Sequence, residues 1–345
     1  MPENRVTASQ WPIVGHEWAV ALLERSIVQG RLSHAYLFTG AAQVGKATLA
    51  RAFAQALCCE CATGVPCGEC RTCRRVAEGR YPDVQYLQAT KNALQIDQVR
   101  ALQADAALSP LEGRYRIFIL REIEQATLPA ANALLKTLEE PPPQVVLLLT
   151  SALRDRVLPT IVSRCQVIGL RPLPLEQVRS ALEMRWGVEP ERAALLARLS
   201  SGRLGWAVGA HADAGLWSAR SRLLDELLSL LEEGYLGRLA YSEQLSRHPD
   251  MLDLALGLWT IWWRDVILVQ RGLPDTIVNV DRRVQLLQQA ELYRPEQAEG
   301  AVMDLVQTAR RLKANVNVRL ALDVLALRMP TPFRQNLGAL LSRPA

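Results

Sequence analysis

The sequence predicts an α/β fold with a parallel sheet in its first half, followed by helices alone. Up to about Pro172, short continuous apolar segments alternate with helical patterns, which is typical of a parallel sheet covered by helices on both faces. The first apolar segment runs into a glycine-rich loop that opens a helix. Two prolines in Leu170–Pro174 interrupt regular helix, and beyond them only helical periodicity remains.

Each element follows from its own pattern. In the first half the expected strands are Ala35–Thr39, Asp83–Leu87, Arg116–Leu120 and Val145–Thr150, and the expected helices are Lys46–Leu57, Ile96–Ala106 and Ala130–Glu140. In the second half the expected helices are Leu175–Trp186, Glu191–Ser200, Leu216–Glu233, Leu236–Arg247, Met251–Arg271, Val280–Leu292, Pro295–Asn315 and Asn317–Met329. The predicted domains are an α/β domain over residues 1–172, a small helical lid over 173–212 and a helical bundle over 213–345.

The composition is typical of a globular protein and argues against a secreted or membrane-spanning one. The 345 residues are 49% apolar and 22% charged, and a net charge of +5 is too small to predict nucleic-acid binding by itself. Met1–Gln10 is polar, so no secretory signal is expected. The apolar stretch Leu252–Gln270 contains Asp253, Arg264 and Asp265, which favour a buried helix over a bilayer span. We therefore expect a soluble cytosolic protein with reduced thiols and no membrane partner.

A phosphate-binding loop is predicted at Gly40-Ala-Ala-Gln-Val-Gly45-Lys46, which follows a strand and opens a helix. Gly40 and Gly45 allow backbone N–H groups to wrap a phosphate, and Lys46 reaches the outer phosphates. The N-terminus of the helix adds positive potential. Spacing and context together predict a nucleotide site.

The same site lacks the groups that would hold a metal ion. The residue after Lys46 is expected to be Ser or Thr, and here it is Ala47. Thr48 follows, but one step along a helix rotates a side chain by about 100°, so Thr48 is kept only as a candidate contact to an inner phosphate. After the strand Arg116–Leu120, Arg121 takes the place of a metal-binding aspartate and Glu122 remains. These losses put ATP/Mg²⁺ binding in doubt and argue against hydrolysis, with an active ATPase that tolerates both substitutions as the alternative.

A cysteine cluster predicts a metal site. Six of the seven cysteines lie between Cys58 and Cys73. We predict that Cys58, Cys67, Cys70 and Cys73 hold a structural Zn²⁺ with no catalytic role, since four thiolates from one short segment suit tetrahedral zinc. Cys59 or Cys61 could replace Cys58. Disulfides, a redox pair and an iron–sulfur cluster are the alternatives.

Several motifs together resemble one family. They are Trp11–His16, Arg31–Gly40, Tyr81–Asp83, Ala131–Pro142 and Leu158–Cys165, in that order around the phosphate loop and the cysteine cluster. Their combination resembles the bacterial DNA polymerase III clamp-loader subunits, which are AAA+ proteins. The resemblance is specific over about Trp11–Leu170, weaker through the lid, and only architectural in the last helices apart from Asn315–Arg319. It implies an AAA+ P-loop domain, a helical lid and a C-terminal helical collar domain.

The resemblance also implies a function. The family has motor subunits (gamma/tau) and a stator subunit (delta-prime) that often lacks an intact ATP site, and the losses at Ala47 and Arg121 resemble the stator, as does a chain without the long extension typical of tau. It implies a cytoplasmic subunit of the DNA polymerase III holoenzyme that helps load the sliding clamp on primed DNA together with gamma/tau and delta subunits. The alternatives are a gamma/tau-type motor and a standalone DNA-stimulated ATPase.

Individual family positions give further expectations. The resemblance implies that Arg164, in Ser163-Arg164-Cys165, is an arginine finger that acts on a neighbour's ATP site, whereas the plain alternative is a surface arginine. The polar sensor of the family falls on Thr150 or Ser151, and the lid arginine of the motors falls on Gly205, close to Arg203. Trp259, Trp262 and Trp263 are either bundle core or an interface. The sequence does not separate these two.

Overall fold

The structure is a computed structural model that describes residues 11–89, 93–314 and 316–332. It divides into two compact units: the first consists of Met1–Gly187 and Ser200–Ala207, and the second of Val188–Leu199 and Val208–Ala345. Each unit is described by itself. Asn315, part of one motif of the family resemblance, lies outside the described residues.

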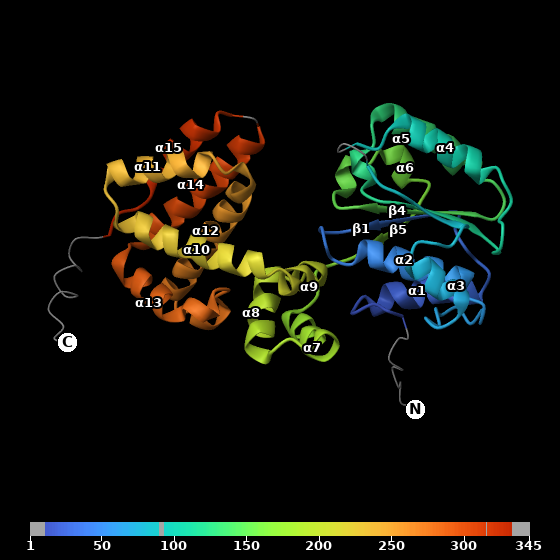
Figure 1. The fold of residues 1–345 in the computed structure, drawn as a ribbon, viewed down its shortest axis with the longest axis horizontal. Helices are drawn as coiled ribbons and strands as arrows, with labels where there is room; N and C mark the ends of the chain where they lie inside the picture. Colours follow the sequence, from blue (N-terminus) through green and yellow to red (C-terminus); the bar gives the residue numbers. More distant parts are fainter. Residues whose placement is uncertain (1–10, 90–92, 315, 333–345) are drawn as a thin grey trace. The chain divides into compact units, whose positions relative to one another are not determined.

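The first unit is built on a five-stranded sheet in the order β2-β3-β4-β1-β5. All its neighbouring strands are parallel, and β1 lies between β4 and β5, as Figure 1 shows. Parallel α/β sheets bind ligands beyond the carboxyl ends of their strands, at the point where the strand order reverses. The loop that follows β1 lies at such a point. The strands are β1 (Ala35–Thr39), β2 (Val84–Leu87), β3 (Arg116–Leu120), β4 (Val145–Ser151) and β5 (Gln166–Gly169).

Helices cover both faces of this sheet (Figure 1). Alternate strand residues point to opposite faces: Tyr36 and Phe38 pack with Leu49 and Phe53 of α2 in one core, whereas Leu37 belongs to the core that α4 and α5 complete on the other face. The helices are α1 (Glu17–Val28), α2 (Lys46–Cys58) and α3 (Arg71–Ala77) on the first face, and α4 (Ile96–Ala106), α5 (Leu128–Glu139) and α6 (Pro159–Val162) on the second. The predicted α/β class is confirmed.

The predicted strands agree with the observed ones within one residue, and β1 and β3 agree at both ends. The prediction missed β5 and the helices α1, α3, α6 and α9 (Leu204–Ala212). Strand β5 has four residues, begins with Gln166 and is only partly buried, so it lacks the continuous apolar run by which the other strands were recognised. α7 (Leu175–Trp186) was predicted at both ends.

The second unit is helical, as expected. Its helices are α8 (Pro190–Ser200, up to Leu199), the end of α9, α10 (Ala214–Glu232), α11 (Tyr235–Ser246), α12 (Pro249–Gln270), α13 (Arg283–Leu292), α14 (Pro295–Lys313) and α15 (Val318–Arg328). α12 packs against α10, α11, α13 and α14. Trp259, Trp262 and Trp263 on α12 are at most 2% exposed, so these tryptophans form the core of the bundle and not an interface.

The helices bear on two predictions, the absence of a bilayer span and the boundaries of the lid. Among the described residues, none of the helices combines the length and the apolar character that a bilayer crossing requires, and the stretch Leu252–Gln270 lies inside α12. The two units divide the predicted lid, since α7 belongs to the first unit and most of α8 to the second. The boundaries at residues 172 and 212 stay a prediction.

Candidate functional site

The phosphate loop joins the end of β1 to the start of α2 in a conformation that needs its glycines. Gly40 has a φ of 136° and Gly45 a φ of 112°, values that side chains with a Cβ disfavour. A Cβ on Gly40 would lie 2.2 Å from the carbonyl oxygen of Leu170. The observed conformation of the loop therefore requires glycine at both positions.

Lys46 is the first residue of α2 and is 8% exposed. Its Nζ donates hydrogen bonds of 2.7 Å to the carbonyl oxygens of Gly40 and Ala41. Burial lowers the pKa of Lys46, and the carboxylates of Glu124 and Glu122 act in the opposite direction. The ammonium group thus lies inside the loop, next to two acidic side chains.

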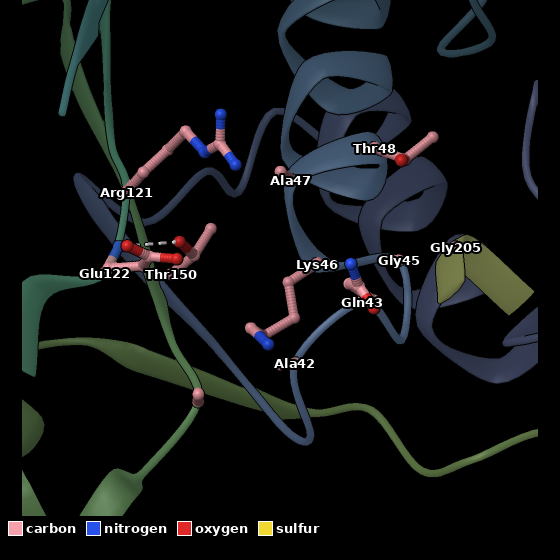
Figure 2. A pocket seen from close by; sticks show the side chains of 11 residues that line it. Ala42, Gln43, Gly45, Lys46, Ala47, Thr48, Arg121, Glu122, Thr150 and Gly205 are labelled. Carbon is pink, nitrogen blue, oxygen red and sulfur yellow. Dashed lines mark hydrogen bonds between the residues drawn. The ribbon is translucent and has the colours of Figure 1, made fainter. Parts of the chain in front are cut away.

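A pocket of about 370 Å³ opens beside this loop (Figure 2). In Figure 2, Arg121 extends from the end of β3 toward Ala47 on α2, whereas Thr48 points away from Arg121. The Nη1 atom of Arg121 donates a long hydrogen bond of 3.4 Å to Oε1 of Gln88. The pocket is lined by Ala42, Gln43, Gly45, Lys46, Ala47, Thr48, Arg121, Glu122, Thr150, Ala152 and Gly205.

The end of β4 supplies the polar residue opposite the loop. The hydroxyl of Thr150 accepts a hydrogen bond of 3.2 Å from the backbone N–H of Glu122 and lines the pocket. The hydroxyl of Ser151 instead accepts a hydrogen bond of 3.1 Å from the N–H of Leu153. Of the two sensor candidates, Thr150 is the one that faces the pocket, because successive strand residues point to opposite sides.

Glu124 is a residue that the sequence analysis missed. Its Oε1 accepts a hydrogen bond of 2.7 Å from the N–H of Ala152, and its Oε2 is buried without a hydrogen-bond partner among the described residues. It is the first of the two carboxylates that oppose the lowered pKa of Lys46. The signal was a second acidic residue two positions after Glu122, within a short 3₁₀ turn (Ile123–Gln125) that follows β3.

On the lid side, Gly205 of α9 approaches the loop directly. Its N–H donates a hydrogen bond of 2.9 Å to the carbonyl oxygen of Gln43, and a Cβ on Gly205 would lie 2.7 Å from that oxygen. Arg203 donates from Nε to the Ser200 carbonyl at 2.9 Å, and its guanidinium lies 5.9 Å from the Trp206 ring centroid. Gly205 lines the pocket, and Arg203 is not among the residues that line it.

The cysteine cluster assembles, but with a different fourth residue. The thiols of Cys59, Cys67, Cys70 and Cys73 all lie within 4.8 Å of one another, so the fourth residue is Cys59, one of the two alternatives, and not Cys58. Cys58 is the last residue of α2 and packs against the apolar core, where burial raises its pKa to about 12. Cys59 has an extended backbone (φ −61°, ψ 129°) that ends the helix, so its side chain leaves the core and joins the other three.

The geometry of these thiols fits a tetrahedral metal ion. Two sulfur ligands at about 2.3 Å from one zinc ion lie roughly 3.8 Å apart, and the sulfur atoms of Cys67 and Cys73 lie 3.9 Å apart. The N–H of Cys70 donates to the Cys67 sulfur and the N–H of Cys73 to the Cys70 sulfur, both at 3.3 Å. Backbone N–H groups of Cys70 and Glu69 lower the pKa of Cys67 to about 6, and this favours the thiolate that a metal needs.

Arg164 lies at the surface, directly after Ser163, the residue that caps the C-terminus of α6. Its Nη2 forms an ion pair of 2.8 Å with Glu139 at the end of α5, and its side chain is 36% exposed. Its Nη1 donates to the carbonyl of Thr160 at 3.0 Å and to the Ser163 hydroxyl at 3.3 Å. The guanidinium is thus oriented by neighbours but remains accessible from outside the chain.

Comparisons with known proteins agree with the sequence resemblance. Residues 15–174 match the family model described as DNA polymerase III, delta subunit. DNA polymerase III subunit delta-prime of Bacillus subtilis is 29% identical over 89% of this chain and 93% of that protein. DNA polymerase III subunit tau of Escherichia coli is 35% identical over 58% of this chain, which spans 33% of that longer protein.

Among solved structures, a DNA polymerase III gamma subunit-related protein from Thermotoga maritima covers 90% of this chain and 98% of its own length at 20% identity. The TM-score of this match is 0.43. The family match and the relatives agree with the resemblance of the sequence motifs. The chain is therefore similar, over most of its length, to the clamp-loader subunits of DNA polymerase III.

Proposed function

We propose that this chain is a delta-prime-like stator subunit, which supports ATP-driven clamp loading without hydrolysing ATP itself. The observation that carries the proposal is the pair formed by Ala47 and Arg121. These residues face each other across the pocket (Figure 2) at the two positions from which a phosphate-loop ATPase contributes oxygen ligands to its metal.

The residues present do not fit a magnesium ion. Mg²⁺ demands oxygen ligands in near-octahedral geometry, and Ala47 has no oxygen in its side chain, while Arg121 is a cation. Thr48 points away from Arg121 in Figure 2. Of the other oxygen-bearing side chains of the pocket, the Thr150 hydroxyl accepts the Glu122 N–H, and the Glu122 carboxylate accepts a hydrogen bond of 3.0 Å from the Gln125 amide. A catalytic glutamate without a metal-held phosphate has no reaction to support, so Glu122 is not assigned a catalytic role.

Arg164 would act on a neighbour's nucleotide. A planar, permanently charged guanidinium stabilises the charge spread over a transferring phosphoryl group. Its exposure and its ion pair with Glu139 support this role, because Glu139 and the Ser163 hydroxyl hold the side chain in one place while one face stays accessible. A subunit with an inactive pocket would then still complete catalysis in trans.

The partners follow from the relatives. DNA polymerase III subunits named delta-prime, tau and gamma/tau are similar to this chain. We infer assembly with gamma/tau-type and delta-type subunits, and through them action on the sliding clamp and primed DNA. The cluster Cys59, Cys67, Cys70 and Cys73 would hold a structural Zn²⁺ with four protein ligands and no position for substrate.

Reconstitution with gamma/tau-type and delta-type partner subunits tests the proposal. Arg164→Ala should leave assembly unchanged on size-exclusion chromatography and lower the ATPase rate of the complex by about tenfold to a thousandfold. Arg156→Ala removes another exposed arginine from the same unit and should leave the rate unchanged. Full ATPase activity of the Arg164→Ala complex would refute the trans role, and Mg²⁺-dependent turnover by the isolated chain, abolished by Lys46→Ala, would favour the motor subunit instead.

A further inference from the structure

Two basic side chains, Lys46 and Arg121, line the pocket beside the phosphate loop. We propose that this pocket binds the polyphosphate chain of a nucleotide without a divalent metal ion, with the Arg121 guanidinium in the place of Mg²⁺. The inference rests on the proposed function, in which the site has lost its metal, and adds which ligand the altered site takes.

The charge of the site supports this substitution. In a phosphate-loop ATPase, one aspartate and one Mg²⁺ stand at this position, and together they carry a single net positive charge. Arg121 alone carries the same charge. The exchange of aspartate for arginine therefore removes the metal and keeps the net charge that faces the phosphates. Arginine also recognises phosphate oxygens through paired N–H donors, which a point charge does not provide.

The shape of the site supports it as well. Arg121 extends from the end of β3 toward Ala47 (Figure 2), so its guanidinium occupies the side of α2 where a Ser or Thr would present its hydroxyl to a metal. Ala47 leaves room there and introduces no hydroxyl that would need a partner. The two substitutions are thus complementary: one removes a metal ligand and the other supplies the cation.

Both cations remain available to a ligand. Within residues 11–89, 93–314 and 316–332, no carboxylate oxygen lies within 4.0 Å of a Lys46 or Arg121 nitrogen. Lys46 donates to two neutral carbonyls of the loop, and Arg121 uses one of its five N–H groups in the long contact with Gln88. Phosphate oxygens would replace these acceptors with charged ones, which form hydrogen bonds about twice as strong.

The test is calorimetric titration of the full chain with ATP, once with excess Mg²⁺ and once with EDTA. Zinc content is measured before and after the EDTA titration, so that loss of an ion from the cysteine cluster is not mistaken for an effect on the pocket. We expect the Kd for ATP in EDTA to equal that in Mg²⁺ within about threefold, and inorganic tripolyphosphate to compete, since the phosphates carry the recognition. Failure of tripolyphosphate to compete, or binding only with Mg²⁺, would overturn the inference.

Variants of Arg121 test whether this residue is responsible for ATP binding without Mg²⁺. Arg121→Ala and Arg121→Gln should each weaken binding by about tenfold or more, while Arg100→Ala, which removes an exposed arginine of α4 that does not line the pocket, should not. Arg121→Asp combined with Ala47→Thr should make binding depend on Mg²⁺. Absence of ATP binding in every condition would refute this inference and leave the Arg164 experiment standing, because the stator role needs no nucleotide in this pocket.

Discussion

The backbone N–H of Gly205 donates a hydrogen bond of 2.9 Å to the carbonyl oxygen of Gln43, which joins the first turn of α9 to the centre of the phosphate loop. The first N–H groups of a helix have no partner inside the helix, so the loop itself satisfies one of them. Gln43 adopts a φ of 61°, and this turns its carbonyl outward to α9. The loop and the start of α9 therefore support each other without any side chain.

Substitution of Gly205 should weaken this contact. A Cβ at Gly205 would lie 2.7 Å from the Gln43 oxygen, which forces the start of α9 away from the loop. We expect Gly205→Ala to destabilise the chain by about 1 kcal/mol, the worth of a lost hydrogen bond, and to speed hydrogen exchange at the loop amides. Gly209→Ala is the matched control, because its Cβ would meet nothing within 4 Å, and it should stabilise by up to about 1 kcal/mol. Equal stabilisation by both variants in thermal unfolding would show that the contact is unimportant.

The metal site gives a prediction that separates two adjacent cysteines. We expect one zinc ion per chain by inductively coupled plasma mass spectrometry, and a loss of most of it in Cys59→Ser. Cys58→Ser should retain the ion, since Cys58 packs against the core and is not among the converging thiols. Prolonged treatment with a strong chelator should lower the thermal unfolding midpoint, because a structural zinc ion contributes to folding. Zinc retained in Cys59→Ser and lost in Cys58→Ser would contradict the observed geometry.

Asp83 explains one motif of the family resemblance. Its carboxylate is fully buried and accepts hydrogen bonds from the backbone N–H groups of Leu111, Glu112 and Gly113 at 2.7, 2.8 and 2.7 Å. An amide has only one accepting oxygen, so Asp83→Asn leaves at least one donor facing an NH₂ group. We expect a loss of about 2–3 kcal/mol in the free energy of unfolding.

The exposed Asp155 provides the control for that measurement. Asp155→Asn makes the same chemical change at the surface and should shift the unfolding free energy by less than about 0.5 kcal/mol. If both variants unfold at the same denaturant concentration as the unchanged chain, the three hydrogen bonds do not hold the loop.

In the helical bundle, the buried side chain of Arg238 binds backbone carbonyl groups, as Asp83 binds backbone N–H groups in the first unit. It is 1% exposed, and its guanidinium donates to the carbonyl oxygens of Leu231, Glu233, Met329 and Pro330. These carbonyls end α10 and follow α15, where no further helix residues can satisfy them. Arg238→Met should therefore destabilise the bundle by about 3 kcal/mol or more, measured by urea unfolding.

Arg222 on α10 serves as the comparison, since it is 62% exposed and pairs with Glu226 at 3.6 Å. Arg222→Met should cost at most about 0.5 kcal/mol, because exposed ion pairs contribute little. Similar losses from Arg222→Met and Arg238→Met would mean that charge, and not the capping of carbonyls, explains the effect.

The sequence by itself determined the α/β class, four of the five strands and the glycine-rich loop between β1 and α2, and it shows Ala47 and Arg121 directly. These features are local: a run of apolar residues, a glycine spacing or a single exchange such as Ala47 is read along the chain. Short and partly exposed elements such as β5 escaped because their burial comes from neighbouring strands and not from their own composition.

Tertiary structure decided which side chains come together and which way they point. The choice of Cys59 over Cys58 depends on where α2 ends, the choice of Thr150 over Ser151 on which side of β4 faces the loop, and the burial of Trp262 on the helices around α12. The roles of Glu124 and Gly205 emerged only from contacts between segments far apart in the chain. A sequence pattern specifies the residue types that a site needs, but packing fixes which atoms come within hydrogen-bonding distance.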